Sequence, residues 1–183
     1  MIIENMESVI VGKRKAIELA LITLLSDGHL LLEDVPGVGK TTLGKALAQS
    51  IQCSFARIQF TPDTFRGCDR HVHVPDADRR IFLHSGAVMN DILLADEINR
   101  TSPKTQASLL EAMEEQQVTV DGTTYALPGL FMVIATQNPV EQLGTYRLPE
   151  AQLDRFLMKI SMGYPETPGD EADIVRRMVN GDP

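Results

Sequence analysis

The stretch "LLLEDVPGVGKTTLGKALAQ", residues 30–49, decides the fold of this chain. It starts with an apolar run typical of a buried strand, passes through a glycine-containing turn, and continues with the apolar spacing of a helix. A strand, a glycine-rich turn and a helix in this order indicate a phosphate-binding loop. One position departs from the strict pattern GxxxxGK[ST], because Asp34 stands where that pattern has its first glycine.

The turn carries the groups that hold a phosphate chain. Glycines let the backbone approach an anion and point main-chain N–H groups at it, and the helix N-terminus adds its dipole. Lys40 would reach the β- and γ-phosphates, and Thr41 would place its hydroxyl on Mg²⁺. We therefore expect ATP and Mg²⁺ as cofactors, bound by Pro36, Gly37, Val38, Gly39, Lys40, Thr41 and Thr42. The alternative is a glycine-rich turn that happens to precede a lysine.

An acidic pair ends a second apolar run, "ILLADE", residues 92–97. In a nucleotide hydrolase, an aspartate at this place holds the Mg²⁺ shell and a glutamate polarises the attacking water. In an isolated strand, such a pair is more simply a solvated loop start. Downstream of a phosphate-binding loop, it predicts Asp96 as a metal residue and Glu97 as a catalytic residue.

Asn138 ends the apolar run "FMVIATQN", residues 131–138. A polar side chain at this strand end could hold the water between Glu97 and the γ-phosphate. Asn138 is also a plausible turn residue before Pro139, and the residue alone does not choose between these readings.

Arg155 lies in "LPEAQLDRF", residues 148–156, where we expect the start of a strand. It could pair locally with Asp154 or Glu150. It could also stabilise transition-state charge in the site of a neighbouring subunit.

The remaining apolar patterns predict strands that alternate with helices. Strands are expected at 29–33, 54–60, 91–96, 130–138 and 155–161, helices at 16–24, 41–49 and 103–115, a hairpin at 117–127, and an amphipathic helix from 169. Strands alternating with helices argue for a parallel sheet covered on both faces. The predicted fold class is therefore α/β, with a central parallel five-stranded sheet in three layers.

Composition limits the class of protein. At 183 residues with 43% hydrophobic content, the chain is long enough for one globular domain, residues 1–183. Lys and Arg number 17 against 25 Asp and Glu, a net charge of −8, which argues against a chain-wide attraction to nucleic acid or anionic membranes. The sequence shows no membrane-span, signal-peptide or disulfide pattern, so a cytoplasmic location is expected.

Four motifs together resemble one family. In their order and spacing, these motifs closely resemble the MoxR branch of the AAA+ ATPases. They are "DVPGVGKTT" (34–42), "LLADEINRTSPKTQASLLEAMEEQQVTVDG" (93–122), "VIATQNPVEQLGTY" (133–146) and "LPEAQLDRFL" (148–157). The resemblance implies a P-loop NTPase fold of the AAA+ type and a Mg²⁺-ATPase that works as a ring, usually a hexamer, with ATP between subunits. It also implies chaperone-like remodelling of client enzymes, often beside a partner with a von Willebrand factor A domain.

The resemblance assigns roles position by position. The matches are Lys40 and Thr41 to the Walker A residues, Asp96 and Glu97 to the Walker B pair, Asn138 to sensor 1, and Arg155 to an arginine finger that acts in trans. Val11 and Gly12, in "VIVGK", match the segment that lines the adenine pocket. An acidic residue at position 34 is tolerated in this family, which favours a genuine nucleotide site. The hairpin residues 120–125 resemble a surface that faces the ring pore or a partner, and a plain hairpin is the alternative.

Two features depart from the family pattern. AAA+ proteins continue into a helical lid, whereas this sequence ends at Pro183, so we expect a core without its lid. Residues 65–85 are atypical and contain His71, His73 and His84, but no further carboxylate or cysteine is spaced to complete a metal site. Codons that encode Cys68 to Ser85 can be chosen so that the same DNA, read one base later, encodes ATGMSMFQMPTGEFSFIP. That shifted sequence resembles the family. The hypothesis is that this segment is translated out of frame.

Two other functions stay open at this point. A chain without the lid could be a nucleotide-binding module that does not hydrolyse ATP. A DNA-associated AAA+ motor is the second alternative, although the acidic balance and the lack of an extended Lys/Arg stripe weigh against it.

Overall fold

A computed structural model describes residues 1–61, 73–75, 81–83, 86–120, 123–139, 146–165 and 167–180 of the chain. Most of the atypical segment 65–85 therefore lies outside the described residues, with His71 and His84, and the shifted-frame hypothesis stays a prediction. Among the described residues, none of the helices combines the length and the apolar character that crossing a membrane takes.

The centre of the molecule is a five-stranded sheet with the order β2-β5-β8-β1-β9. Its strands are β1 (Leu30–Glu33), β2 (Phe55–Gln59), β5 (Ile92–Asp96), β8 (Met132–Gln137) and β9 (Met158–Ile160). Every neighbouring pair in it is parallel, so all the strands end at the same edge of the sheet. Polar residues that follow these strands are thereby gathered at one edge.

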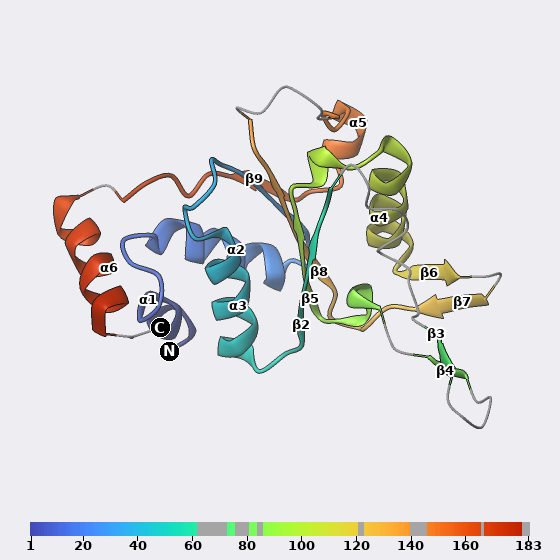
Figure 1. The fold of residues 1–183 in the computed structure, drawn as a ribbon, viewed down its shortest axis with the longest axis horizontal. Coiled ribbons are helices and arrows are strands. Elements are labelled where there is room, and N and C mark those ends of the chain that lie inside the picture. The colour runs from blue at the N-terminus through green and yellow to red at the C-terminus, as the bar shows by residue number, and fades with distance from the viewer. Residues whose placement is uncertain are drawn as a thin grey trace.

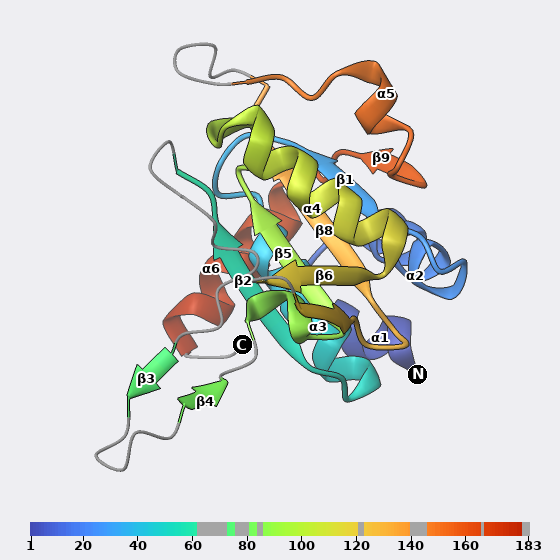
Figure 2. The same cartoon turned by 90° about the vertical axis from the view of Figure 1, so that its right-hand side faces the viewer.

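Helices cover both faces of the sheet (Figure 1). One face packs on α1 (Ile2–Glu7), α2 (Arg14–Leu25) and α3 (Lys40–Ile51). The other packs on α4 (Pro103–Glu115), which crosses the strands in Figure 2, and on the short α5 (Glu150–Leu153). Alternate residues of β1 divide between the two cores, since Leu30 and Leu32 belong to the first and Leu31 to the second. The fold is a three-layer α/β arrangement, as predicted.

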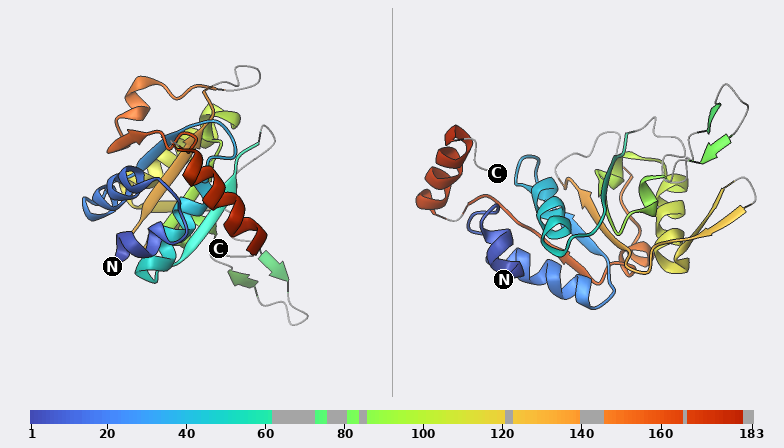
Figure 3. Two further views of the ribbon diagram at one scale, coloured as in Figure 1. Left: turned by 90° about the vertical axis from the view of Figure 1, so that its left-hand side faces the viewer. Right: turned by 90° about the horizontal axis from the view of Figure 1, so that it is seen from below.

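The shorter elements lie around this frame. They are the 3-10 turns η1 (Ala87–Met89) and η2 (Ile98–Arg100), the hairpins β3–β4 (His73–Pro75, Ile81–Leu83) and β6–β7 (Gln117–Val120, Thr123–Ala126), and α6 (Pro168–Asn180). The helix α6 and the β6–β7 hairpin lie at opposite ends of the molecule (Figure 3). The hairpin predicted at 117–127 is present, although its turn residues 121–122 lie outside the described residues.

One predicted boundary is wrong. Arg155 lies in the turn between α5 and β9, and not at the start of a strand. Within the described part of the chain, β9 is an edge strand that pairs with β1 alone, and that ladder begins where Met158 pairs with Leu30. The main-chain N–H groups of Arg155 and Phe156 donate back to the carbonyl oxygens of Gln152 and Leu153, at 3.4 and 3.0 Å, so this stretch closes the turn after α5 and does not join the sheet.

Candidate functional site

The phosphate-binding loop connects β1 to α3 at the carboxyl edge of the sheet, where α/β folds place their ligands. Gly37 and Gly39 have φ of 88° and 90°, a conformation that side chains disfavour, and no heavy atom lies closer than 3.9 Å to a Cβ built at either position. The glycines are therefore required by backbone conformation and not by crowding. Helix α3 begins directly at Lys40, so its unpaired N–H groups face the loop.

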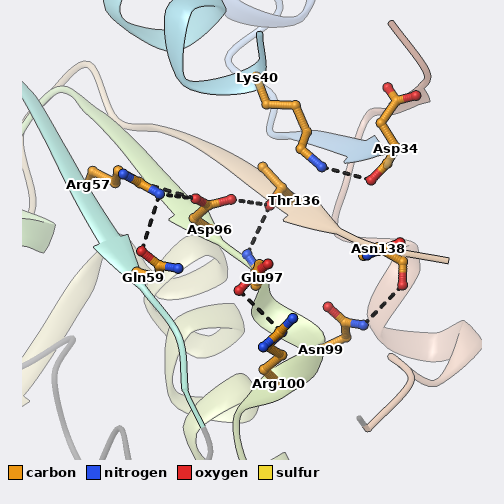
Figure 4. A network of polar contacts seen from close by, with 10 residues as sticks. All are labelled: Asp34, Lys40, Arg57, Gln59, Asp96, Glu97, Asn99, Arg100, Thr136 and Asn138. Carbon is orange, nitrogen blue, oxygen red and sulfur yellow. Dashed lines mark hydrogen bonds and ion pairs between the residues drawn. The ribbon is translucent and has the colours of Figure 1, made fainter. Parts of the chain in front are cut away.

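Lys40 turns back into its own loop. Its Nζ donates to the carbonyl oxygens of Asp34 at 2.7 Å and Val35 at 3.3 Å. Burial lowers the pKa of the Lys40 amine, and the carboxylates of Asp96, Asp34 and Glu97 oppose that shift because they stabilise the ammonium. The predicted phosphate-binding cation and the predicted acidic pair thus come together in one place (Figure 4).

Asp96 ends β5 with both carboxylate oxygens occupied. Oδ1 accepts a hydrogen bond of 2.6 Å from Thr136 Oγ1, and Oδ2 accepts from Arg57 Nη2 at 2.5 Å and Nε at 3.2 Å. Arg57 comes from β2 and also reaches Gln59 Oε1 at 3.3 Å. The carboxylate of Asp96, which is predicted to face Mg²⁺, therefore already binds a cationic side chain through Oδ2.

Glu97 follows Asp96 in a left-handed conformation, with φ of 59°. Its main-chain N–H donates to Thr136 Oγ1 at 2.9 Å, so the same hydroxyl that binds Asp96 also fixes the backbone of Glu97. The carboxylate Oε2 lies 3.2 Å from Arg100 Nε, one turn further along η2. The left-handed conformation turns the chain away from the direction of β5, and the ion pair with Arg100 holds the Glu97 side chain.

Asn138 follows β8 and is buried beside Asn99. Asn99 Nδ2 donates to the Asn138 carbonyl oxygen at 3.4 Å, while Asn99 Oδ1 is buried and has no hydrogen-bond partner among the described residues. Gln106 Nε2, from α4, donates to the Ile98 carbonyl at 3.0 Å and so fixes the turn that carries Asn99. Asn138 therefore stands at the same edge as Asp96 and Glu97 (Figure 4).

Arg155 pairs with neither Asp154 nor Glu150. Its Nη2 and Nε donate to Glu114 Oε2 at 2.6 and 3.0 Å, and its Nη1 donates to the Ala151 carbonyl at 3.0 Å. Glu114 lies on α4, 41 residues away in sequence. These contacts engage all three nitrogens of the guanidinium, and one N–H each on Nη1 and Nη2 is left for another acceptor.

A cavity of about 370 Å³ adjoins the phosphate-binding loop. It is lined by Val9, Ile10, Val11 and Lys13, by Gly37, Val38, Gly39 and Thr42, and by Gly163, Tyr164, Pro165, Ile174 and Arg177. Of the two residues predicted to line an adenine pocket, Val11 lies in the wall. Gly12 does not line this cavity but a separate one of about 400 Å³, and a Cβ at Gly12 would meet Asp170 Cγ at 2.9 Å.

The residues fit a magnesium ion. Mg²⁺ in nucleotide sites takes one or two protein oxygens and completes its shell with phosphates and water. The carboxylate of Asp96 and the hydroxyl of Thr41, in the first turn of α3, are oxygen donors of this kind, and Asp96 already attracts a cation. In the described part of the chain, no group of three or more His, Cys, Asp or Glu side chains could hold a metal by itself.

Several contacts of this site were not predicted from the sequence. Arg57, Arg100 and Glu114 each pair with a predicted site residue, and Thr136 bridges the acidic pair. Two weak signals exist. Arg57 is a charge inside the alternating run "FARIQF", and Thr136 is a hydroxyl in the strand that ends at Asn138.

The chain is similar to known proteins over most of its length. A model of the ATPase family associated with various cellular activities (AAA) matches residues 29–158. The chain is 56% identical over 174 residues to YeaC of Bacillus subtilis, covering 94% of this chain and 54% of YeaC. It is 46% identical over 175 residues to the chaperone MoxR1 of Mycobacterium tuberculosis, covering 95% of this chain and 46% of MoxR1.

A solved structure agrees with these relatives. A crystal structure of a provisionally named ATPase from Cytophaga hutchinsonii superposes with a TM-score of 0.89 at 43% identity, covering 98% of this chain and 54% of that one. The chain spans about half the length of the curated relatives it matches. The family match and the relatives named MoxR confirm the resemblance seen in the motifs: this chain belongs to the AAA family of ATPases, in its MoxR branch.

Proposed function

We propose that this chain binds ATP and hydrolyses it to ADP and phosphate. The observation that carries the proposal is the position of Lys40 at the same edge of the sheet as the carboxylates of Asp96 and Glu97 (Figure 4), at the end of the loop that adjoins the 370 Å³ cavity. A nucleotide whose base and ribose occupy the cavity has its phosphates at Gly37, Gly39 and the start of α3. Membership in a family of ATPases supports the same assignment.

The residues divide the work of hydrolysis. Main-chain N–H groups of the loop and the ammonium of Lys40 bind the phosphate oxygens, which requires Lys40 to leave the carbonyls of Asp34 and Val35. Glu97 accepts a proton from the attacking water, whose oxygen forms the new bond to the γ-phosphorus while the bond to the bridging oxygen of ADP breaks. Asn138 orients that water. Thr41 and Asp96 would hold Mg²⁺, which would supply neutralisation of the phosphate charge.

We assign Arg155 to the site of a neighbouring subunit. One N–H on each of Nη1 and Nη2 is available for phosphate oxygens while Glu114 and Ala151 hold the other three N–H groups of the guanidinium. This assignment makes the active form a ring, with a hexamer as the expected size. The relative named as a chaperone, MoxR1, supports a role in remodelling partner proteins. Cytoplasmic location, a von Willebrand factor A partner and a client enzyme stay predictions.

Phosphate release from Mg²⁺-ATP tests the proposed activity. The parent is compared with Lys40→Ala, which removes the phosphate-binding cation, and with Glu97→Gln, which keeps the shape of the side chain and removes the proton acceptor. We expect turnover to fall by orders of magnitude in both variants. ATP binding should be lost in Lys40→Ala and kept in Glu97→Gln. Tight ATP binding without phosphate release in the parent would instead identify a nucleotide-binding module.

A further inference from the structure

Asp34, the residue that replaces the first glycine of the loop pattern, is buried and fully engaged. It is 6% exposed and stands just beyond the end of β1. Its carboxylate accepts three hydrogen bonds from the segment that follows β9: Oδ1 from Ser161 Oγ at 2.8 Å and from Gly163 N at 3.1 Å, and Oδ2 from Met162 N at 2.5 Å. A glycine at this position would make none of these contacts.

The position of Asp34 in the sheet explains this bridge. β1 and β9 pair in parallel up to the register Leu32 with Ile160, and beyond that point the two chains separate. The main-chain N–H of Asp34 still donates to the Gln137 carbonyl at 3.2 Å and so continues the ladder toward β8. On the other side, the carboxylate spans the gap that the ladder with β9 leaves open. Successive N–H groups of Met162 and Gly163 form a small anion cradle around it.

The segment that Asp34 holds becomes a wall of the nucleotide cavity. Gly163, Tyr164 and Pro165 face the loop glycines across that cavity. A second contact holds the same wall, because the buried Lys13 donates to the Tyr164 carbonyl at 2.6 Å. The phosphate loop and the opposite wall are thus joined through one side chain of the loop itself.

We propose that Asp34 is a positioning residue for the nucleotide, which acts by fixing residues 161–165 relative to the phosphate-binding loop. This inference rests on the proposed function, since it assigns the cavity to ATP. It makes Asp34 a part of the site that a strict glycine pattern would lack. Restoring the glycine with Asp34→Gly should therefore weaken nucleotide binding, although it brings the loop closer to the strict pattern.

The link itself is tested without nucleotide, by hydrogen exchange of the Met162 and Gly163 amides in the parent, Asp34→Gly and Asp34→Asn. We expect exchange at both amides to be roughly tenfold faster or more in Asp34→Gly, because the acceptor is gone. Asp34→Asn keeps the shape and one oxygen acceptor, so its exchange should be intermediate. Circular dichroism and thermal unfolding establish that each variant is folded.

The consequence for the site is tested by titration with mant-ADP, a fluorescent ADP analogue, in the presence of Mg²⁺. If the unlinked wall is in its binding arrangement about a tenth of the time, the apparent Kd rises about tenfold in Asp34→Gly. The matched control is Asp91→Gly. Asp91 also accepts a main-chain and a hydroxyl hydrogen bond, from Ser54, but it lies at the opposite end of the strands. We expect this control to leave the mant-ADP affinity unchanged.

The outcomes separate the two proposals. Unchanged exchange at Met162 and Gly163 in Asp34→Gly overturns the link. Faster exchange with unchanged mant-ADP affinity overturns the positioning role. A parent that shows protected amides but binds no mant-ADP contradicts the proposed function, and with it the role of Asp34 toward nucleotide, while the link stands.

Discussion

Arg57 Nη2 lies 2.5 Å from Asp96 Oδ2, so the carboxylate predicted to face Mg²⁺ is paired with a cation of its own chain. The side chain of Asp96 is 12% exposed and that of Arg57 is 42% exposed, which places the pair at the boundary of the core. A carboxylate in this position is stable only when positive charge is near. Arg57 supplies this charge in the absence of metal.

Removing Arg57 should therefore destabilise the metal-free protein. We expect Arg57→Ala to lower the free energy of unfolding by about 1–2 kcal/mol, less than for a fully buried pair because the guanidinium is partly solvated. Urea unfolding measures this loss. Addition of Mg²⁺ and ADP should then stabilise the variant more than the parent, because the metal restores the missing charge beside Asp96. An equal gain in both proteins would contradict this account, and Arg57→Lys is the conservative control.

The hydroxyl of Thr136 joins the acidic pair, since it donates to Asp96 Oδ1 and accepts from the Glu97 main chain. Thr136→Val keeps the shape of the side chain but leaves both groups without this partner. We expect a loss of about 1–3 kcal/mol in the free energy of unfolding and a lower ATPase rate. Thr136→Ser retains the hydroxyl and should recover most of both. If Thr136→Val and Thr136→Ser behave alike, the hydroxyl has no such role.

His29 makes stability depend on pH. Its Nδ1 accepts a hydrogen bond of 3.1 Å from the Val133 amide, and burial lowers the pKa of the imidazole below its ordinary value of 6.5. The unfolded chain therefore binds the proton at a higher pH than the folded one. The contribution of the neutral His29 imidazole to stability is complete above pH 6.5 and is lost as the pH falls from there through the lowered pKa. Unfolding free energies between pH 5 and 8 should show this slope in the parent and a flatter profile in His29→Gln.

Glu114 should support the action of Arg155 without replacing it. Glu114→Gln removes the charge that holds Arg155 Nε and Nη2, so we expect a lower ATPase rate than in the parent but a higher one than in Arg155→Ala. The double variant should match Arg155→Ala, because the glutamate acts only through the arginine. Glu115→Gln removes the same charge one position along α4 and is the control. A further loss in the double variant would show that Glu114 acts separately.

The sheet and the motif residues were accessible from the sequence for a simple physical reason. Strands of a parallel sheet are buried on both faces, so Leu30–Leu32 and Ile92–Ala95 appear as continuous apolar runs. A polar residue at the end of such a run marks the edge of the sheet where ligands bind, which locates Asp96 and Asn138. The phosphate-binding loop has fixed spacing and therefore needs no tertiary information.

The partners of these residues could not be predicted in the same way. Ser161, Met162 and Gly163 bind Asp34 from 127 to 129 residues away, and Arg57 binds Asp96 from 39 residues away. Only the strand order brings these pairs together, and apolar periodicity does not determine strand order. The sequence presents Asp34 as an exception in a pattern, and the structure gives it three donors.

The central claim is that the chain completes an ATPase site with a residue from a neighbouring subunit. The most direct measurement is the turnover of Mg²⁺-ATP by Lys40→Ala and Arg155→Ala, each alone and then mixed in equal amounts at high protein concentration. Each variant alone should be inactive. In a mixed ring, Lys40→Ala subunits supply an intact arginine to the intact phosphate loops of Arg155→Ala subunits, so about a quarter of the interfaces should regain activity. A mixture as inactive as its components, beside an active parent, would contradict the shared site.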